Sequence, residues 1–209
     1  VFVTGSPLYE VLKKNEVKIQ NSDVVERLGL EKGNYIVVSA HREENIDLKN
    51  QFEVLAESLN AVADKYKMPI IFSTHPRTKN RMQKSNFVFN PLIKSVAPLG
   101  FFDYVKLQQN AYVVLSDSGT ISEESAMMGF PAVSIRTSTE RPEAVDAGTI
   151  VLGGVSTDSM LNAIEITKGL AIHESSQLPW EYLVTNTSER IVKVIQSYTP
   201  IVNKVIWDK

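Results

Sequence analysis

Residues 111–129 read AYVVLSDSGTISEESAMMG, and this stretch decides the fold. A continuous apolar run, typical of a strand that is buried on both faces, leads through a small polar turn into a segment that favours a helix. The unit is therefore a strand followed by a helix. Because ligands of open parallel sheets bind beyond the carboxyl ends of the strands, the turn of this unit is a candidate binding site.

The same unit recurs along the chain. Further short apolar runs stand before helical or polar segments at residues 35–40, 69–74, 130–135 and 149–154. Continuous apolar strands that alternate with helices predict a parallel sheet with helices on both faces, and right-handed crossovers make such a sheet doubly wound. We therefore predict an α/β fold with a Rossmann-like sheet. The sequence contains no GxGxxG fingerprint, so a dinucleotide ligand is not favoured.

Two segments lie outside this repeating pattern, one on each side of the predicted sheet domain at residues 35–183. Residues 1–34 contain two short helical patterns. Residues 184–209 predict an amphipathic helix that Pro200 kinks or breaks, and its apolar face needs a packing partner. This apolar stripe consists of Ile191, Val194, Ile195 and Tyr198.

Composition excludes several classes of function. The 209 residues are 43% hydrophobic, enough for a sizeable core, and their net charge of −2 does not favour nucleic acid as a partner. Without cysteine there is no disulfide framework and no thiolate metal site, and no apolar stretch reaches the roughly 20 residues of a membrane span. We expect a cytoplasmic protein. Because the sequence begins VFVTGSP, without Met, we also expect a piece of a longer chain.

Polar segments follow four of the predicted strands. They are expected to converge, because the carboxyl ends of parallel strands meet at one edge of the sheet. The four segments are residues 39–45, 74–81, 116–124 and 136–143.

The segment at 116–124 is suited to an anion. Ser118, Gly119 and Thr120 stand at the end of the turn and the start of the helix, where backbone N–H groups lack intrahelical acceptors. Such a turn suits a phosphate or diphosphate. About one helical turn later, Glu124 could accept hydrogen bonds from two vicinal hydroxyls, as a ribose presents them. Alternatively, Ser118 or Thr120 is only a helix cap, with Glu123 as its capping-box partner, and both interpretations can hold together.

Two of the three histidines end neighbouring predicted strands, which favours a site over solvated surface residues. His41 and Arg42 follow the first strand and could neutralise a diphosphate, and His75 follows the second. His173 has no such placement and is interpreted as a surface residue. Because His41, His75 and Asp117 lack the short spacing of metal ligands, no metal site is predicted.

Arg141 lies between Glu140 and Glu143 and directly before Pro142, a suitable first residue of a helix. It is either a phosphate ligand that one of these carboxylates holds in place, or a member of a surface ion pair that contributes little to stability. Its position after a strand favours the ligand role. A hydrolase with a nucleophile elbow is not indicated, because the turn at 117–121 does not have the G-x-S-x-G pattern.

The order and spacing of several motifs resemble those of the non-hydrolysing UDP-N-acetylglucosamine 2-epimerase family. The resemblance covers essentially the whole chain and corresponds to the C-terminal half of a two-domain enzyme with the GT-B architecture. The combination of TERPE with DSG and a following EE is the most specific part. The motifs are FVTGSP, SAHREENID, THP, APLGFFDYVKL, LSDSGTISEES, RTSTERPEAVDAGT and SERIVKVIQSYTPIVNKVIW.

The resemblance implies a reaction without metal or nicotinamide. Family members remove the C2 proton of a UDP-2-acetamido sugar, eliminate UDP to give a 2-acetamidoglycal, and add both back with inversion at C2. It also implies residue roles. Ser118, Gly119 and the backbone of Thr120 would contact the diphosphate, Arg141 would bind a phosphate, and Glu124 would bind the ribose. His41 would be catalytic or lie beside the diphosphate, and His75 would be a weaker UDP contact.

One departure concerns the sugar. Most UDP-N-acetylglucosamine epimerases read DSGG, whereas this chain reads DSGT at residues 117–120. The chain thus looks closer to the branch that forms UDP-N-acetyl-L-fucosamine for capsule and other surface polysaccharides. A glycosyltransferase half of the same architecture and a UDP-binding module without chemistry stay open as alternatives.

The resemblance further implies partners. Residues 1–34 would be an interdomain segment with leading helices, and residues 184–209 a helix that packs on the N-terminal domain. The acids that move the C2 proton would belong to that domain. We therefore expect the fragment to bind UDP weakly and to epimerise nothing, and the full-length enzyme to form a homodimer.

Overall fold

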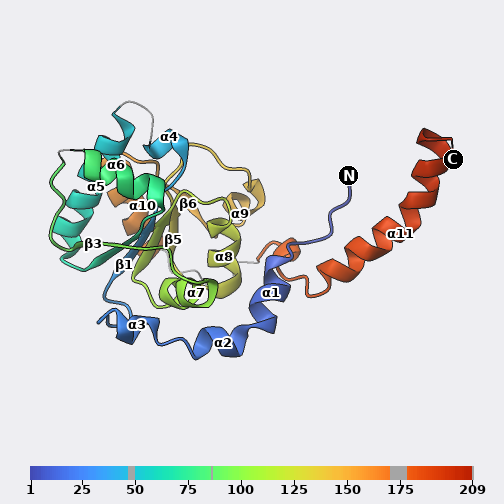
Figure 1. Ribbon diagram of the computed structural model, residues 1–209, viewed down its shortest axis with the longest axis horizontal. Coiled ribbons are helices and arrows are strands. Elements are labelled where there is room, and N and C mark those ends of the chain that lie inside the picture. The colour runs from blue at the N-terminus through green and yellow to red at the C-terminus, as the bar shows by residue number, and fades with distance from the viewer. Residues whose placement is uncertain (47–49, 86, 170–177, 209) are drawn as a thin grey trace.

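The computed structural model describes residues 1–46, 50–85, 87–169 and 178–208 (Figure 1). Its centre is a six-stranded sheet in which all neighbouring strands are parallel, in the order β3-β2-β1-β4-β5-β6. This is the doubly wound Rossmann-like order, so the predicted fold class is confirmed. The strands are β1 (Ile36–Ser39), β2 (Ile70–Ser73), β3 (Ile93–Val96), β4 (Val113–Ser116), β5 (Ala132–Ser134) and β6 (Val151–Leu152).

Helices cover both faces of the sheet. On one face α5 and α10 pack against alternate strand residues such as Ile36 and Val38, while Tyr35 and Val37 point into the core beneath α3, α7 and α8. This alternation makes each central strand a continuous apolar run. The helices are α1 (Leu8–Lys14), α2 (Glu16–Gln20), α3 (Val24–Arg27), α4 (Glu43–Ile46), α5 (Gln51–Tyr66), α6 (Pro76–Lys84), α7 (Phe101–Gln109), α8 (Ile121–Met128), α9 (Pro142–Asp146), α10 (Thr157–Gly169) and α11 (Thr187–Ile206), with a 3₁₀ turn, η1, at Trp180–Tyr182.

The front of the chain differs from its prediction in one respect. It forms three short helices, α1 to α3, where the sequence indicated two. Leu12 of α1 and Ile19 of α2 share a small buried cluster with Val105 of α7, so these helices pack against the sheet domain. The first residues are held as well: the Ser6 N–H donates to the Glu181 carbonyl oxygen at 2.8 Å, and the Thr187 hydroxyl donates to the Ser6 carbonyl oxygen at 3.3 Å.

Gly5 makes this contact possible. Its φ of +97° lies in the region that favours glycine, and a Cβ there would stand 2.7 Å from Cβ of Val184. The first segment therefore lies directly against the chain that leads into α11.

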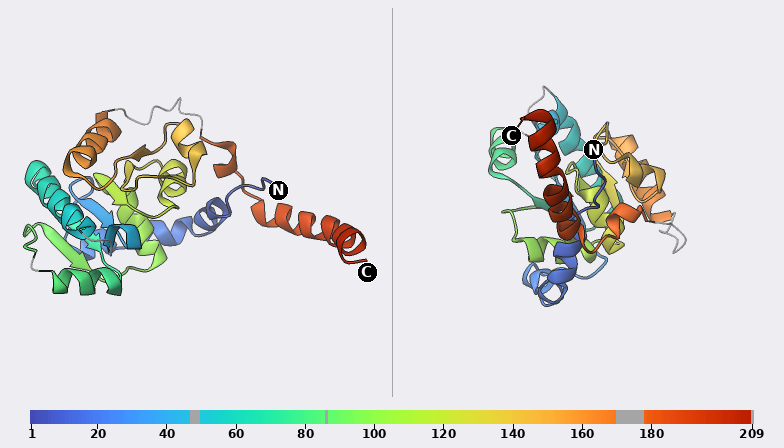
Figure 2. Two further views of the ribbon diagram at one scale, coloured as in Figure 1. Left: turned by 90° about the horizontal axis from the view of Figure 1, so that it is seen from above. Right: turned by 90° about the vertical axis from the view of Figure 1, so that its right-hand side faces the viewer.

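Helix α11 projects from the body of the molecule beside the N-terminal segment (Figures 1 and 2). Pro200 lies inside it and does not break it, because the helix continues to Ile206; of the two outcomes expected at this proline, a break is wrong. The predicted apolar stripe is largely exposed, with Ile195 at 55% and Tyr198 at 43%, and the Tyr198 ring contacts Phe2. Among the described residues, no helix is both long and apolar enough to cross a membrane.

Candidate functional site

The site lies where the strand order reverses. β1 and β4 are neighbours with Ser39 opposite Ser116, and the chain leaves their carboxyl ends towards helices on opposite faces of the sheet. Such a switch point opens a crevice outside the sheet. Two of the predicted polar segments, 39–45 and 116–124, therefore stand side by side.

A buried carboxylate joins these two segments. Asp117 is 0% exposed, and its Oδ2 accepts hydrogen bonds from the backbone N–H groups of His41 and Arg42, both at 2.9 Å. The Asn45 side-chain amide donates to the same oxygen at 3.0 Å. His41 Nδ1 lies 3.2 Å from the other oxygen, Oδ1. Asp117 thus fixes the loop after β1 on the end of β4.

Sequence reasoning considered Asp117 only as a metal ligand and missed this role. A signal was available, since an acid that directly continues a buried strand must find partners inside the fold. Its three donors lie more than 70 positions away in the sequence, and no local spacing identifies them.

The turn before α8 meets two other segments. A Cβ on Gly119 would lie 3.5 Å from Oε2 of Glu140 and 3.9 Å from Nη2 of Arg42. The Ser118 and Thr120 hydroxyls are 2.9 Å apart, and Thr120 donates to Oε1 of Glu124 at 2.8 Å. The structure thus places the turn at residues 118–120, predicted to bind an anion, beside the loops that follow β1 and β5.

The capping-box interpretation of this turn is wrong. Thr120 is the N-cap of α8, but its side chain makes no capping hydrogen bond. The carboxylate of Glu123 is engaged elsewhere, because Oε1 accepts from Nε of Arg141 at 2.6 Å and Oε2 accepts from the hydroxyl of Ser6. The first N–H groups of α8 are therefore not covered by the expected box.

Glu124 is held by two donors, one on each carboxylate oxygen. The Thr120 hydroxyl bonds to Oε1, and Nε2 of the buried Gln108 donates to Oε2 at 2.7 Å. Each carboxylate oxygen has a second lone pair, so further hydroxyls can still be bound.

Arg141 has a partner that the sequence did not indicate. It was expected to pair with the carboxylate of Glu140 or Glu143, but its Nε donates to Glu123, and only the carbonyl oxygen of Glu140 accepts from its Nη1, at 3.3 Å. The hydrogen bond with Glu123 raises the pKa of Arg141 above its ordinary value, so the guanidinium keeps its charge.

Glu140 instead joins two other arginines. Its carboxylate lies 3.0 Å from Nη2 of Arg136 and 3.6 Å from Nη2 of Arg42. The hydrogen bond from Arg136 contributes most to lowering the Glu140 pKa. Arg136, which is 5% exposed at the end of β5, was not singled out from the sequence although it lies in the predicted segment 136–143.

The second histidine lies farther from the switch point. His75 follows β2, on the side of β1 opposite to β4, and its exposed ring caps α6 by accepting the Arg77 N–H at Nδ1, 3.5 Å away. His173 lies outside the described residues.

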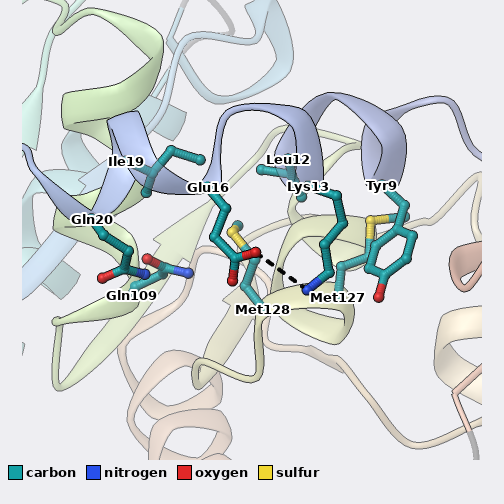
Figure 3. Close-up of a pocket in the computed structure, with 9 residues that line it drawn as sticks. All are labelled: Tyr9, Leu12, Lys13, Glu16, Ile19, Gln20, Gln109, Met127 and Met128. Atoms are coloured by element: carbon teal, nitrogen blue, oxygen red, sulfur yellow. Dashed lines mark ion pairs between the residues drawn. The ribbon is translucent and has the colours of Figure 1, made fainter. Parts of the chain in front are cut away.

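A groove of about 340 Å³ adjoins the site, lined by residues 2–7 together with Glu123, Arg141 and Tyr182. A second pocket, of about 200 Å³, lies at the other end of α8 (Figure 3). Met127 and Met128 line it, and a Lys13–Glu16 ion pair of 3.5 Å spans it. None of the predicted site residues lines this second pocket.

Known proteins resemble the chain over nearly all its length. A sequence model of the family described as UDP-N-acetylglucosamine 2-epimerase matches residues 1–196. The UDP-N-acetylglucosamine 2-epimerase of Methanocaldococcus jannaschii is 30% identical over 210 residues, which cover 93% of this chain and 54% of that protein. The chain spans about half the length of the curated relatives it matches.

Solved structures agree. The UDP-N-acetylglucosamine 2-epimerase of Rickettsia bellii superposes with a TM-score of 0.88 at 35% identity, covering 99% of this chain and 56% of that one. The M. jannaschii enzyme in complex with UDP-GlcNAc and UDP gives a TM-score of 0.77 at 28% identity, covering 94% and 54%. This chain therefore belongs to the UDP-N-acetylglucosamine 2-epimerase family.

Proposed function

We propose that this chain is the UDP-binding C-terminal half of a non-hydrolysing UDP-2-acetamido-sugar 2-epimerase. One observation carries the proposal: the helix N-terminus at Ser118–Thr120 and the cations Arg42 and Arg141 come from separate segments and meet around Glu140, whose carboxylate lies beside Gly119 and Arg42 and whose carbonyl oxygen accepts from Arg141. A helix N-terminus flanked by arginines suits a diphosphate. The relative from M. jannaschii, whose structure holds UDP-GlcNAc and UDP, supports this ligand.

Each part of the crevice is assigned to one part of UDP. The hydroxyl of Ser118 and the backbone at Gly119 and Thr120 face the diphosphate, because Gly119 lets an oxygen approach the main chain. Glu124, already oriented by Thr120 and Gln108, binds the two ribose hydroxyls. His75 is assigned to the edge of the site as a weaker contact, since its Nδ1 already accepts from Arg77.

The chemistry follows from the leaving group. Elimination breaks the C2–H bond and the C1–oxygen bond, forms a C1–C2 double bond, and leaves the electron pair of the second bond on the UDP diphosphate. Arg42, Arg141 and the α8 N-terminus stabilise that charge as it develops. His41 lies beside the diphosphate, and the base that takes the C2 proton belongs to the N-terminal domain. Return of the proton to the opposite face, with re-addition of UDP, completes the inversion.

The substrate is a UDP-2-acetamido sugar, either the N-acetylglucosamine and N-acetylmannosamine pair or the 2,6-dideoxy-L-talose and L-fucosamine pair. Thr120 in place of a second glycine keeps its backbone N–H for the phosphate and adds a hydroxyl that contacts Glu124. We assign the enzyme to bacterial surface polysaccharide synthesis in the cytoplasm, as a homodimer at full length. Turnover of the two sugar pairs by the longer protein, followed by NMR, separates them.

Helix α11 is proposed to pack on the N-terminal domain. Its apolar side chains are exposed, with Ile195 at 55% and Val202 at 38%, and its first turn forms hydrogen bonds with Ser6 and Glu10. We therefore take residues 1–34 and 184–209 as the parts that join this half to the other, and residues 35–183 as the UDP-binding domain.

Calorimetric titration of UDP into the chain tests the proposal. Glu124→Ala and Arg141→Ala are each expected to weaken binding about ten-fold, the value of one charge-assisted hydrogen bond. The matched controls are Glu165→Ala and Arg27→Ala. Glu165 on α10 pairs with Lys65, and Arg27 on α3 pairs with Asp103, so both variants should bind UDP as the parent chain does. Unchanged affinity in both site variants would contradict the assignment.

Activity supplies a second test. The chain alone is expected to epimerise nothing, because the groups that move the C2 proton are assigned to the other half. Detectable turnover by these 209 residues would refute this. Sugar transfer to an added acceptor without a glycal product would indicate the glycosyltransferase alternative.

A further inference from the structure

The two oxygens of the Asp117 carboxylate are in different situations. Oδ2 accepts three hydrogen bonds, from the backbone of His41 and Arg42 and from the side chain of Asn45. Oδ1 is buried and makes no hydrogen bond to any residue in the described ranges. A carboxylate oxygen removed from water without a donor is costly, so this one requires an explanation.

The polar atom that faces Oδ1 is Nδ1 of His41, 3.2 Å away. The two atoms are within reach but not aligned, and such contacts commonly tighten when a ligand binds. The carboxylate itself cannot turn away, because three donors hold Oδ2 and Asn45 also bonds to the Ile135 carbonyl oxygen at 3.3 Å. The position of Oδ1 is thus set before any ligand arrives.

We propose that Asp117 is a positioning residue, whose Oδ1 accepts the Nδ1–H of His41 and leaves Nε2 as the nitrogen that meets the ligand. This deepens the role proposed for His41 and rests on that proposed function. The hydrogen bond made by one ring nitrogen of a histidine decides which nitrogen carries the proton and how the ring is oriented. With the proton held on Nδ1, a neutral His41 presents an acceptor at Nε2, and a protonated one presents a donor.

The same chain contains a histidine with the opposite arrangement. Nδ1 of His75 accepts an N–H from Arg77, which requires that a neutral ring carries its proton on Nε2. His41 and His75 should therefore be opposite tautomers, and one spectrum of a ring-¹⁵N-labelled sample reports both.

The variant Asp117→Asn makes the test sharp. Because three N–H donors meet Oδ2, the amide oxygen of the new side chain must take that position, and its NH₂ must take the position of Oδ1. A donor then faces His41 Nδ1, which forces that nitrogen to become an acceptor. The matched control is Asp103→Asn. Asp103 lies on α7, and its carboxylate accepts hydrogen bonds from Ser22 and from Arg27 of α3.

The spectra are recorded at about pH 8.5, two units above the pKa of a free imidazole, and His41→Gln identifies the His41 signals. We expect the proton of His41 on Nδ1 in the parent chain and in Asp103→Asn, and on Nε2 in Asp117→Asn. Because Asp117 acts through His41, UDP affinity should fall by no more than about five-fold in Asp117→Asn, the loss expected when the His41 ring is removed, and stay unchanged in Asp103→Asn.

A parent chain with the His41 proton on Nε2 overturns the inference, and so does an unchanged tautomer in Asp117→Asn. If that variant does not fold, the tautomer of the parent chain still decides. Should the parent chain bind no UDP while His41 carries its proton on Nδ1, the proposed function fails and the positioning of His41 by Asp117 is confirmed.

Discussion

Strand β1 has two neighbours, and the two junctions at its carboxyl end are built differently. Towards β4, the buried Asp117 binds the loop after β1 through three donors. Towards β2, no buried carboxylate is seen among the described residues at the junction: Thr78 on α6 donates to the Ala40 carbonyl oxygen at 2.9 Å, and His75 caps the same helix. In the sequence both junctions look alike, a strand followed by a histidine. The strand order makes the difference, because only the β1–β4 junction is a switch point.

The largest expected effect is on the free energy of unfolding, which should fall more when the β1–β4 junction is altered than when the β1–β2 junction is. Asp117→Ala leaves three buried or partly buried N–H groups without their acceptor and should reduce the free energy of unfolding by about 3–5 kcal/mol. The comparable change on the β2 side, Thr78→Ala, removes one neutral hydrogen bond and should cost about 1 kcal/mol. Urea denaturation measures both, and equal losses would show that the two junctions do not differ.

The next effect concerns ion pairs on the two sides. Glu123→Ala frees Arg141 from the carboxylate that orients it and should weaken UDP binding about ten-fold. Its counterpart is Glu43→Ala, which removes the 3.0 Å ion pair with Arg77 beside His75. That variant should bind UDP as the parent chain does. Calorimetry of both variants is the test, and a greater loss of UDP affinity in Glu43→Ala than in Glu123→Ala would contradict the difference between the two junctions.

Replacing each histidine by asparagine compares the junctions directly. His41→Asn should lower UDP affinity about five-fold, because one hydrogen-bonding group beside the diphosphate is lost. His75→Asn should lower it by less than two-fold, and stability should be retained because asparagine is itself a good helix N-cap. The reverse order of affinities would place the ligand at the β2 side.

The smallest effect is expected at Thr120. Thr120→Gly keeps the backbone N–H and removes only the hydroxyl that contacts Glu124, so UDP affinity should change by less than about three-fold. Thermal unfolding of the same variant is the control for lost helix stability. A loss above ten-fold would mean that the Thr120 side chain, not its backbone, binds the ligand.

The sequence predicted the fold where burial was complete. Runs such as 35–40 and 111–117 are apolar throughout because helices cover both faces of the central strands, and the structure contains them as β1 and β4. β3 was not among the predicted runs, because an edge strand with exposed Lys94 and Ser95 has no continuous apolar pattern. Local periodicity detects double-sided burial and misses a half-covered edge.

For the site, the sequence predicted the segments but not the partners. Ser118, Gly119 and Arg42 do meet, as expected for loops at one edge of a parallel sheet. The pairing of Arg141 with Glu123 was not predicted, because Glu140 and Glu143 are nearer to Arg141 in the sequence and were the expected partners. The carboxylate that pairs with Arg141 is determined by how α8 packs against the loop before α9, which is a property of the tertiary fold.

The contact between the first residues and the start of α11 has a mechanical consequence. The Ser6–Glu181 and Thr187–Ser6 hydrogen bonds, with Gly5 fitted against Val184, fasten two strands of chain that are more than 170 positions apart. The two segments are therefore expected to move together. Because Ser6 also bonds to Glu123, and Glu123 to Arg141, a continuous series of hydrogen bonds leads from this contact to the candidate site, so a shift of the first residues and α11 would be felt at Arg141.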